Sequence, residues 1–199
     1  MGGTRRIFLG VFVLVIVVSG CRAQDKPVLS RSPFSEEQLS VYRGFLDMLS
    51  VLHSRNLSTV SVPFDFTGFP ETRPCLNGIE LENVSAAQQI IHTFGPEITK
   101  GRDLKLVDRQ EQKKLLKQRD GPPTVPKEKL TAESQQTGSE LNFLVLSEIA
   151  FDKKHQFAVV KYLLVCGEHC ASGTARVMEK VDGKWIVSSR PVCAGLIGY

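Results

Sequence analysis

Four cysteines that follow residue 21 are the side chains of this chain with the most distinctive chemistry. Cys166 and Cys170 flank the tripeptide Gly-Glu-His, whereas Cys75 and Cys193 lie far apart in the sequence. An even number of cysteines in an exported domain indicates a disulfide framework. The sequence allows three pairings. Proximity favours a bridge between Cys166 and Cys170, which would leave Cys75 to join Cys193.

The same region allows a second chemistry, because Cys166, His169, Cys170 and Cys193 could in principle give a tetrahedral zinc set. Their spacing is not that of a recognised zinc signature, and an oxidising compartment competes for the thiols. Redox exchange is disfavoured as well, since three residues separate Cys166 from Cys170 and thioredoxin-like motifs have two. We therefore expect disulfides, no metal and no cofactor, with His169 as a solvated loop residue.

Basic side chains crowd one short segment that is expected to be helical. They are Lys113, Lys114, Lys117 and Arg119. Residues 33–99 carry 3 basic and 8 acidic side chains, whereas residues 100–129 carry 10 basic and 5 acidic. One interpretation is a solvated helix face paired with the acidic part of the same domain. The other is a contact with anionic lipid headgroups or with an acidic protein of the cell envelope.

Other catalytic signatures are missing from the sequence. It contains no G-x-S-x-G, H-E-x-x-H, G-x-x-x-x-G-K or G-x-G-x-x-G motif. His53 and His92 fall near the ends of expected helices and His155 in an expected turn, so each is interpreted as a capping or surface histidine rather than a base. These observations favour a protein that is not an enzyme.

Residues 1–21 form an export signal that ends in a cysteine. Arg5 and Arg6 precede an apolar run over residues 7–18, which would make a helix of about 18 Å, well short of the roughly 30 Å hydrocarbon core of a bilayer. The run is therefore typical of a signal peptide. Its end, Val-Ser-Gly-Cys21, resembles the lipobox of bacterial lipoproteins.

This resemblance implies that residues 1–20 are a signal peptide and that Cys21 carries palmitate and anchors the chain in a membrane. It also places the remaining residues outside the cytoplasm. Arg22 is not the aspartate that often retains such proteins at the inner membrane, so the outer membrane is favoured if the organism is Gram-negative.

Elements expected in the first half of the chain follow from caps and periodicity. Polar residues 21–33 are expected to be a tether. Ser35 and Gln38 have the spacing of a capping box before an apolar stripe, which predicts a helix over residues 36–54. Alternation predicts an edge strand over 60–66. Further segments are a loop over 67–78, a helix over 85–93, a strand over 104–107 and a helix over 109–119 that Asp108 caps.

The last third carries the strongest strand pattern. Four segments rich in valine, leucine, isoleucine and phenylalanine cover residues 141–151, 156–166, 174–181 and 185–192. Asp182-Gly183 has the signature of a two-residue hairpin turn with positive φ at both positions. We expect an N-terminal amphipathic helix packed on a C-terminal antiparallel β-meander. The fold class is α+β, in a single domain over residues 34–199 with a polar loop near 120–139.

This part of the chain resembles a group of uncharacterised secreted bacterial domains that end in a hairpin with a CG-x2-C motif and an EK-x-DGKW-x-V turn. The matching residues are Phe151, Asp152, Ala158, Cys166, Gly167, Cys170, Gly173, Glu179, Lys180, Gly183, Lys184 and Trp185. The resemblance supports the fold class and implies no activity. A helix on a curved antiparallel sheet is also analogous to cystatin-like and nuclear-transport-factor-like architectures.

Composition excludes one class of partner. The 199 residues carry 25 basic and 21 acidic side chains and a formal charge of +4, which falls to +2 without the two leader arginines. So weak a charge argues against nucleic-acid binding. The sequence thus predicts a lipid-anchored envelope protein with a non-enzymatic binding or structural role. The alternative is a small envelope enzyme, or a redox or zinc protein, centred on Cys166 and Cys170.

Overall fold

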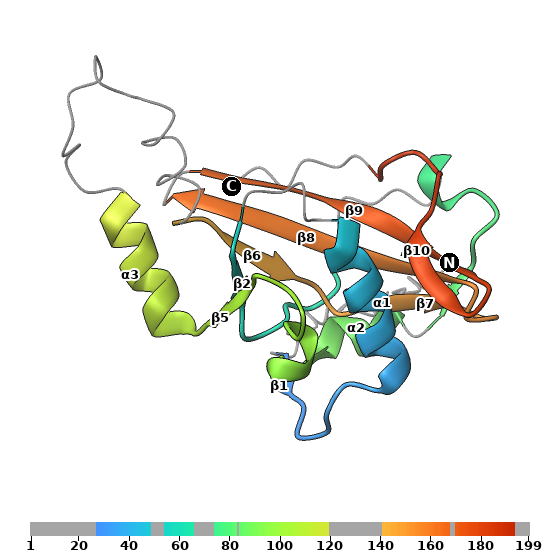
Figure 1. Ribbon diagram of the computed structural model, residues 1–199. Coiled ribbons are helices and arrows are strands. Elements are labelled where there is room, and N and C mark those ends of the chain that lie inside the picture. Colours follow the sequence, from blue (N-terminus) through green and yellow to red (C-terminus); the bar gives the residue numbers. More distant parts are fainter. Residues whose placement is uncertain are drawn as a thin grey trace, which may run out of the picture.

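The computed structural model describes residues 27–48, 54–65, 74–82, 84–119, 141–167 and 170–193. Within them the chain has the predicted α+β fold, in which helices cover a large mixed sheet (Figure 1). Several predictions lie outside the described residues: the signal peptide over 1–20, the anchor Cys21, the loop residue His169 and the polar loop over 121–139.

Helix α1, Glu36–Met48, begins where the sequence predicts. The Ser35 backbone N–H donates to Gln38 Oε1 at 2.9 Å, and the Gln38 N–H donates to Ser35 Oγ at 3.2 Å. This reciprocal pair confirms the capping box. The apolar stripe of the helix is buried, with Tyr42 and Phe45 fully inaccessible. Residues 49–53 of the expected helix lie outside the described part of the chain.

A long hairpin forms the centre of the sheet. Strand β8, Phe157–Gly167, pairs antiparallel with β9, Cys170–Val181, which pairs antiparallel with β10, Lys184–Val187. Asp182 and Gly183 join β9 to β10 with φ of 50° and 76°. These angles confirm the predicted two-residue turn.

The strand expected over 141–151 is interrupted. It consists of β6, Phe143–Leu146, and β7, Ala150–Asp152, both antiparallel to β8. The interruption falls at the buried residues Ser147 and Glu148. The Ser147 N–H still donates to the Lys161 carbonyl at 2.9 Å, but the Lys161 N–H donates to Ser147 Oγ and not to a backbone carbonyl. Strand β7 pairs on its other side with β3, Leu81–Glu82.

Two short strands make the sheet mixed rather than a pure antiparallel meander. Strand β2, Asn56–Ser58, is parallel to both β6 and β5, Lys105–Val107. Within the described residues, eight strands belong to this sheet, and its main path has the order β10-β9-β8-β6-β2-β5. The predicted antiparallel meander therefore accounts for β6, β8, β9 and β10, whereas the parallel pairing of β2 was not predicted.

Residues 60–65 form isolated bridges in place of the regular strand predicted over 60–66, and residue 66 lies outside the described part of the chain. Val60 and Val62 form only isolated bridges, to Thr93 and Ser147. Ser61 is 1% exposed, whereas Val62 is 42% exposed. The Ser61 hydroxyl has polar partners in the interior, which turns this residue inward, whereas Phe64 is fully buried as the alternation predicts.

Short elements complete the fold. Helix α2, Val84–Gln89, is shorter than predicted because β4, Ile90–Ile91, follows at once and pairs in parallel with β1, Val28–Leu29. Strand β1 lies within the expected tether, which is therefore partly structured. The remaining elements are two 3-10 helices, η2, Pro74–Leu76, and η3, Pro96–Ile98, and helix α3, Arg109–Arg119, which has the predicted bounds.

Apolar residues pack on both faces of the hairpin. Successive residues of a strand point to opposite faces, so Ala158 and Val160 join the core under α1, whereas Val159 joins a second core around Cys75 and Cys193. A third, smaller cluster lies under α3. The buried apolar residues of the described chain all lie between Phe34 and Cys193.

Gly44 sets the close approach of α1 to the sheet edge. A Cβ built on Gly44 would overlap the Trp185 carbonyl of β10. Trp185 itself is 4% exposed and belongs to the core under α1. Glycine is therefore required where the helix crosses β10.

Candidate functional site

Two cysteine pairs lie at disulfide distance, with the pairing that proximity favoured. The Cα atoms of Cys75 and Cys193 are 5.2 Å apart, and those of Cys166 and Cys170 are 5.0 Å apart. Such pairs are typical of an exported protein in an oxidising compartment. The described residues contain no group of three or more histidine, cysteine, aspartate or glutamate side chains that could hold a metal ion.

The two pairs differ in their surroundings. Cys75 and Cys193 are 1% and 0% exposed, and the Cys193 backbone pairs with Ala175 of β9. Cys170 is exposed and lies beside the end of the β8–β9 hairpin. The first pair clamps the segment around η2 to the C-terminal part of the sheet, whereas the second closes only the tip of a hairpin.

A buried polar cluster joins three segments that are distant in sequence. Both Glu148 carboxylate oxygens lie 3.0 Å from His92 Nδ1, and Glu148 Oε1 accepts the His92 backbone N–H at 2.9 Å. The Ser61 hydroxyl hydrogen-bonds to Glu148, and Ser61 Oγ accepts the His92 N–H at 2.8 Å. Glu148 is 3% exposed.

Aromatic side chains surround this cluster. The His92 ring lies 4.6 Å from the Phe34 ring, which stacks on Phe94. The Tyr42 hydroxyl donates to the Ser147 carbonyl at 2.7 Å. Burial, together with the charge of Glu148, raises the pKa of Tyr42 well above its ordinary value.

The arrangement of Ser61, Glu148 and His92 is not that of a hydrolase. In a catalytic triad the histidine ring lies between the serine and the acid, so that it can take the hydroxyl proton. Here the carboxylate lies between the serine hydroxyl and the histidine ring. The cluster joins segments of the fold that are distant in the sequence. Its residues escaped the sequence analysis, which interpreted His92 as a helix-end residue.

A second ionic cluster lies at the surface beside the N-terminus of α1. His155 Nδ1 lies 2.7 Å from Glu37 Oε2, and Lys180 Nζ donates to Glu37 Oε1 at 2.9 Å. The His155 ring stacks on Phe151 at 4.8 Å. His155 does lie in the predicted turn, with φ of 50°, but it links that turn to α1.

This cluster predicts a pH dependence of stability. The hydrogen bond to Glu37 raises the pKa of His155, although burial opposes this shift. The contribution of protonated His155 to the free energy of unfolding is therefore complete below about pH 6.5, the pKa of an unperturbed histidine. It is lost as the pH rises through the folded-state pKa. Burial opposes ionisation of Glu37 as well, but hydrogen bonds from Lys180 and His155 outweigh it and lower the pKa of Glu37. That contribution is complete above about pH 4.3 and is lost on acidification.

We therefore expect the free energy of unfolding of His155→Gln to fall less than that of the wild type between pH 6 and pH 8. Because the His155 side chain is 43% exposed, the difference is below about 1 kcal/mol. Urea unfolding at each pH measures it. Identical profiles of the two proteins would contradict the assignment to His155.

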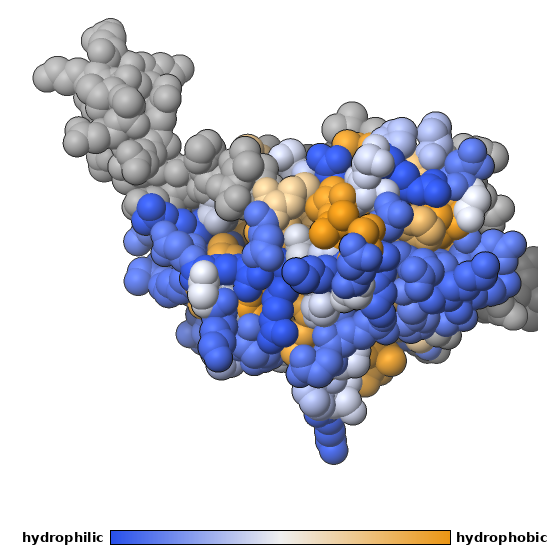
Figure 2. Space-filling model, turned by 45° about the vertical axis from the view of Figure 1, so that its right-hand side comes forward, coloured by the Kyte–Doolittle hydropathy of each residue, from blue (hydrophilic) through white to orange (hydrophobic). Residues whose placement is uncertain are grey.

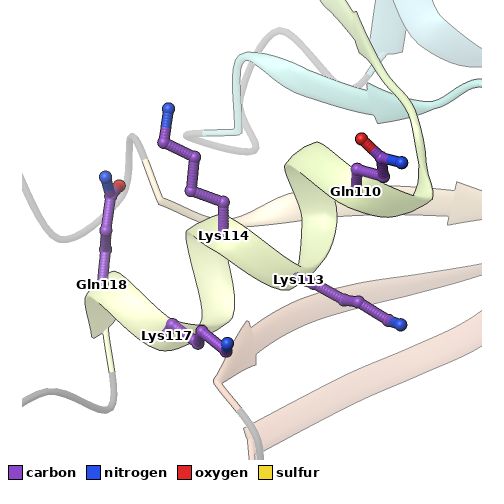
Figure 3. Close-up of a pocket in the computed structure, with 5 residues that line it drawn as sticks. All are labelled: Gln110, Lys113, Lys114, Lys117 and Gln118. Atoms are coloured by element: carbon purple, nitrogen blue, oxygen red, sulfur yellow. The ribbon is translucent and has the colours of Figure 1, made fainter.

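The predicted basic residues come together on α3, at one end of the molecule (Figure 1). Residues at spacings of three and four share one face of a helix. Three of the lysines and two glutamines at this spacing line an open depression of about 370 Å³. We call these five residues the lysine face: Gln110, Lys113, Lys114, Lys117 and Gln118. Figure 3 shows Lys114 and Gln118 pointing away from Lys113 and Lys117, so the face consists of two diverging rows. The side chain of Arg119 is outside the described part.

The elements that position the lysine face are those that the sequence predicts. Asp108 Oδ1 accepts the backbone N–H groups of Gln110 at 2.8 Å and Glu111 at 2.9 Å, which caps the helix. On the opposite face, Leu115 is buried in the small core with Val107 and Phe143. The lysine face is thereby turned to solvent.

Figure 2 shows one face of the molecule, on which hydrophilic side chains predominate and hydrophobic ones form separate patches. The exposed large hydrophobic residues are Val28, Leu29, Val62, Ile90, Val181, Ile186 and Val192. In the described part of the chain, no helix is both long and apolar enough to cross a membrane.

Comparison with known proteins does not identify a family for this chain. No protein-family model, no curated protein and no solved structure matches this chain. The analogy with cystatin-like and nuclear-transport-factor-like folds therefore stays an analogy, and the function rests on the residues themselves.

Proposed function

We propose that this protein is an exported, lipid-anchored component of the bacterial cell envelope with a non-enzymatic binding or structural role. The lipobox Val-Ser-Gly-Cys21 after an apolar run of signal-peptide length carries this proposal. Lipidation of Cys21 would hold the domain at a membrane surface, and the outer membrane is the favoured location in a Gram-negative organism.

Two features of the fold support the proposal. The cysteine pairs Cys75–Cys193 and Cys166–Cys170 fit an oxidising compartment outside the cytoplasm. The buried residues of the described chain begin at Phe34, thirteen residues after Cys21, so a lipid on Cys21 does not disturb the core.

The alternative is a redox or zinc protein centred on Cys166 and Cys170, and it makes a different prediction. It requires free thiolates or a bound metal, because a thiolate is both the nucleophile and the zinc ligand. The distance between Cys166 and Cys170 favours the disulfide instead. Thiol quantification and metal analysis of protein isolated from the envelope distinguish the two: four oxidised cysteines without zinc support the binding protein.

Metabolic labelling with a palmitate analogue tests the anchor. We expect label on the wild type and none on Cys21→Ala, because the alanine has no thiol to accept an acyl group. Cys170→Ala is a matched control that removes another cysteine and keeps the label. Absence of label on the wild type, or equal labelling of Cys21→Ala, would overturn the proposal.

A further inference from the structure

The lysine face has an unusual composition for a helix surface. Its positions 110, 113, 114, 117 and 118 include no carboxylate and no apolar residue. Three long ammonium side chains therefore lie within two helical turns, all exposed to solvent. Like charges at this spacing repel one another and destabilise a helix. An anionic surface opposite them would relieve that repulsion.

The three lysines of the lysine face have no ion-pair partner among the described acidic residues. Within the described residues no ion pair involves Lys113, Lys114 or Lys117, whereas nine ion pairs join other groups. The carboxylates that are already paired are Glu36, Glu37, Asp47, Glu80, Glu82, Asp103, Glu111 and Glu148. The interpretation that the basic helix pairs with the acidic part of the same domain is thus not supported.

The helix also excludes one mode of membrane contact. Its apolar residues, Leu115 and Leu116, pack toward the core beneath α3, so no apolar face is available to enter a bilayer. Any attraction to a membrane is therefore electrostatic, through ammonium groups and phosphate oxygens. An electrostatic contact of this kind weakens as salt shortens the Debye length from about 10 Å at 0.1 M to about 3 Å at 1 M.

We propose that the lysine face docks the domain on the anionic lipid headgroups of the membrane that holds its anchor. This inference rests on the proposed function, because the anchor is what brings the face to a bilayer. The seven residues from Cys21 to Val28 span at most about 25 Å, which keeps the domain near the headgroups. Beside a lipid anchor, a basic patch is a recognised additional signal for membrane binding.

The open shape of the lysine face is better suited to contact with a membrane than with a folded protein partner. The depression on α3 is shallow, and its two rows of side chains diverge (Figure 3). Long flexible lysine stems reach phosphates at variable positions, as fluid lipids require. The contact would fix which side of the domain faces the bilayer.

Vesicle co-sedimentation tests the docking without the anchor. The chain from residue 22 onward, which contains every described residue, is incubated at low salt with phosphatidylcholine vesicles that contain or lack phosphatidylglycerol. We expect binding to the anionic vesicles only, and loss of binding at high salt. With roughly one kcal/mol for each lysine near a charged surface, Lys113→Gln, Lys114→Gln and Lys117→Gln together weaken the partition coefficient by about 100-fold.

A matched variant controls for net charge. Lys100→Gln, Lys154→Gln and Lys184→Gln remove the same charge from three separate exposed positions, and this variant is expected to bind within a few-fold of the wild type. Equal loss in both triple variants, equal binding to neutral vesicles, or no binding by the wild type would overturn the docking proposal. Failure here leaves palmitate labelling at Cys21 unchanged, so the two proposals fail separately.

Discussion

Glu148→Ala is expected to lower the free energy of unfolding by about 1–3 kcal/mol. The carboxylate is 3% exposed and accepts hydrogen bonds from the Ser61 hydroxyl and the His92 backbone, while its charge faces the His92 ring. Truncation leaves the His92 N–H with Ser61 Oγ at 2.8 Å and the Ser61 hydroxyl with the His92 carbonyl at 3.2 Å as their acceptors. The loss therefore comes from the buried acceptor that both donors share and from its contact with the His92 ring. Urea unfolding followed by circular dichroism measures the loss.

Glu36→Ala is the matched control for this experiment. The Glu36 side chain is 89% exposed and lies 3.9 Å from Arg43, so its removal costs less than about 1 kcal/mol. If Glu148→Ala cost no more than Glu36→Ala, the buried cluster would not be the element that joins the segments around Ser61 and His92 to the β6–β7 interruption.

Removal of the buried disulfide has the second large effect. The double variant Cys75→Ala, Cys193→Ala is expected to lose about 5 kcal/mol, because the bridge closes a loop with a sequence separation of 118 and so restricts the unfolded chain strongly. Both sulfur atoms also pack in the core with Phe64 and Val177. Chemical unfolding under oxidising conditions measures the change.

Cys166→Ala, Cys170→Ala is the matched double variant. Its loop has a sequence separation of 4, for which chain entropy gives about 2 kcal/mol, and Cys170 is exposed. We predict that the variant without the Cys75–Cys193 bridge loses more stability than the variant without the Cys166–Cys170 bridge. A hairpin variant as unstable as the Cys75 and Cys193 variant would show that the buried bridge is not the principal covalent clamp.

Local signals in the sequence were sufficient for several elements. Ser35 and Gln38 bond reciprocally at the start of α1, and Asp108 caps α3. The Asp182-Gly183 turn depends only on two residues that tolerate positive φ. In each case the interacting residues lie within a few positions of one another, so a short stretch of sequence is sufficient to predict the element.

Elements that depend on distant partners were not predictable in this way. Strand β2 pairs in parallel with β5 and β6, and nothing in Asn56–Ser58 indicates those neighbours. Ser61 faces inward because Glu148 lies 87 residues away in the sequence and next to it in space. A period-2 pattern assumes that polar residues face water, and a buried polar cluster reverses that assumption.

The candidate sites show the same difference between local features, which the sequence predicts, and long-range contacts, which it does not. The lysine face follows from helical spacing, so Lys113, Lys114 and Lys117 were identifiable before the fold was known. That they have no ion-pair partner among the described residues required the structure, which shows for example that Glu111 of the same helix pairs with Lys105. The pairing of Cys75 with Cys193 was one of three alternatives until the two segments were placed together.

The intact mass and N-terminal sequence of the protein isolated from its native membrane test the central claim most directly. The account predicts a mature chain that begins at Cys21, carries the added mass of acyl chains on that residue and contains no free thiol among Cys75, Cys166, Cys170 and Cys193. An unmodified chain that begins after Cys21, or one that retains residues 1–20, would contradict it.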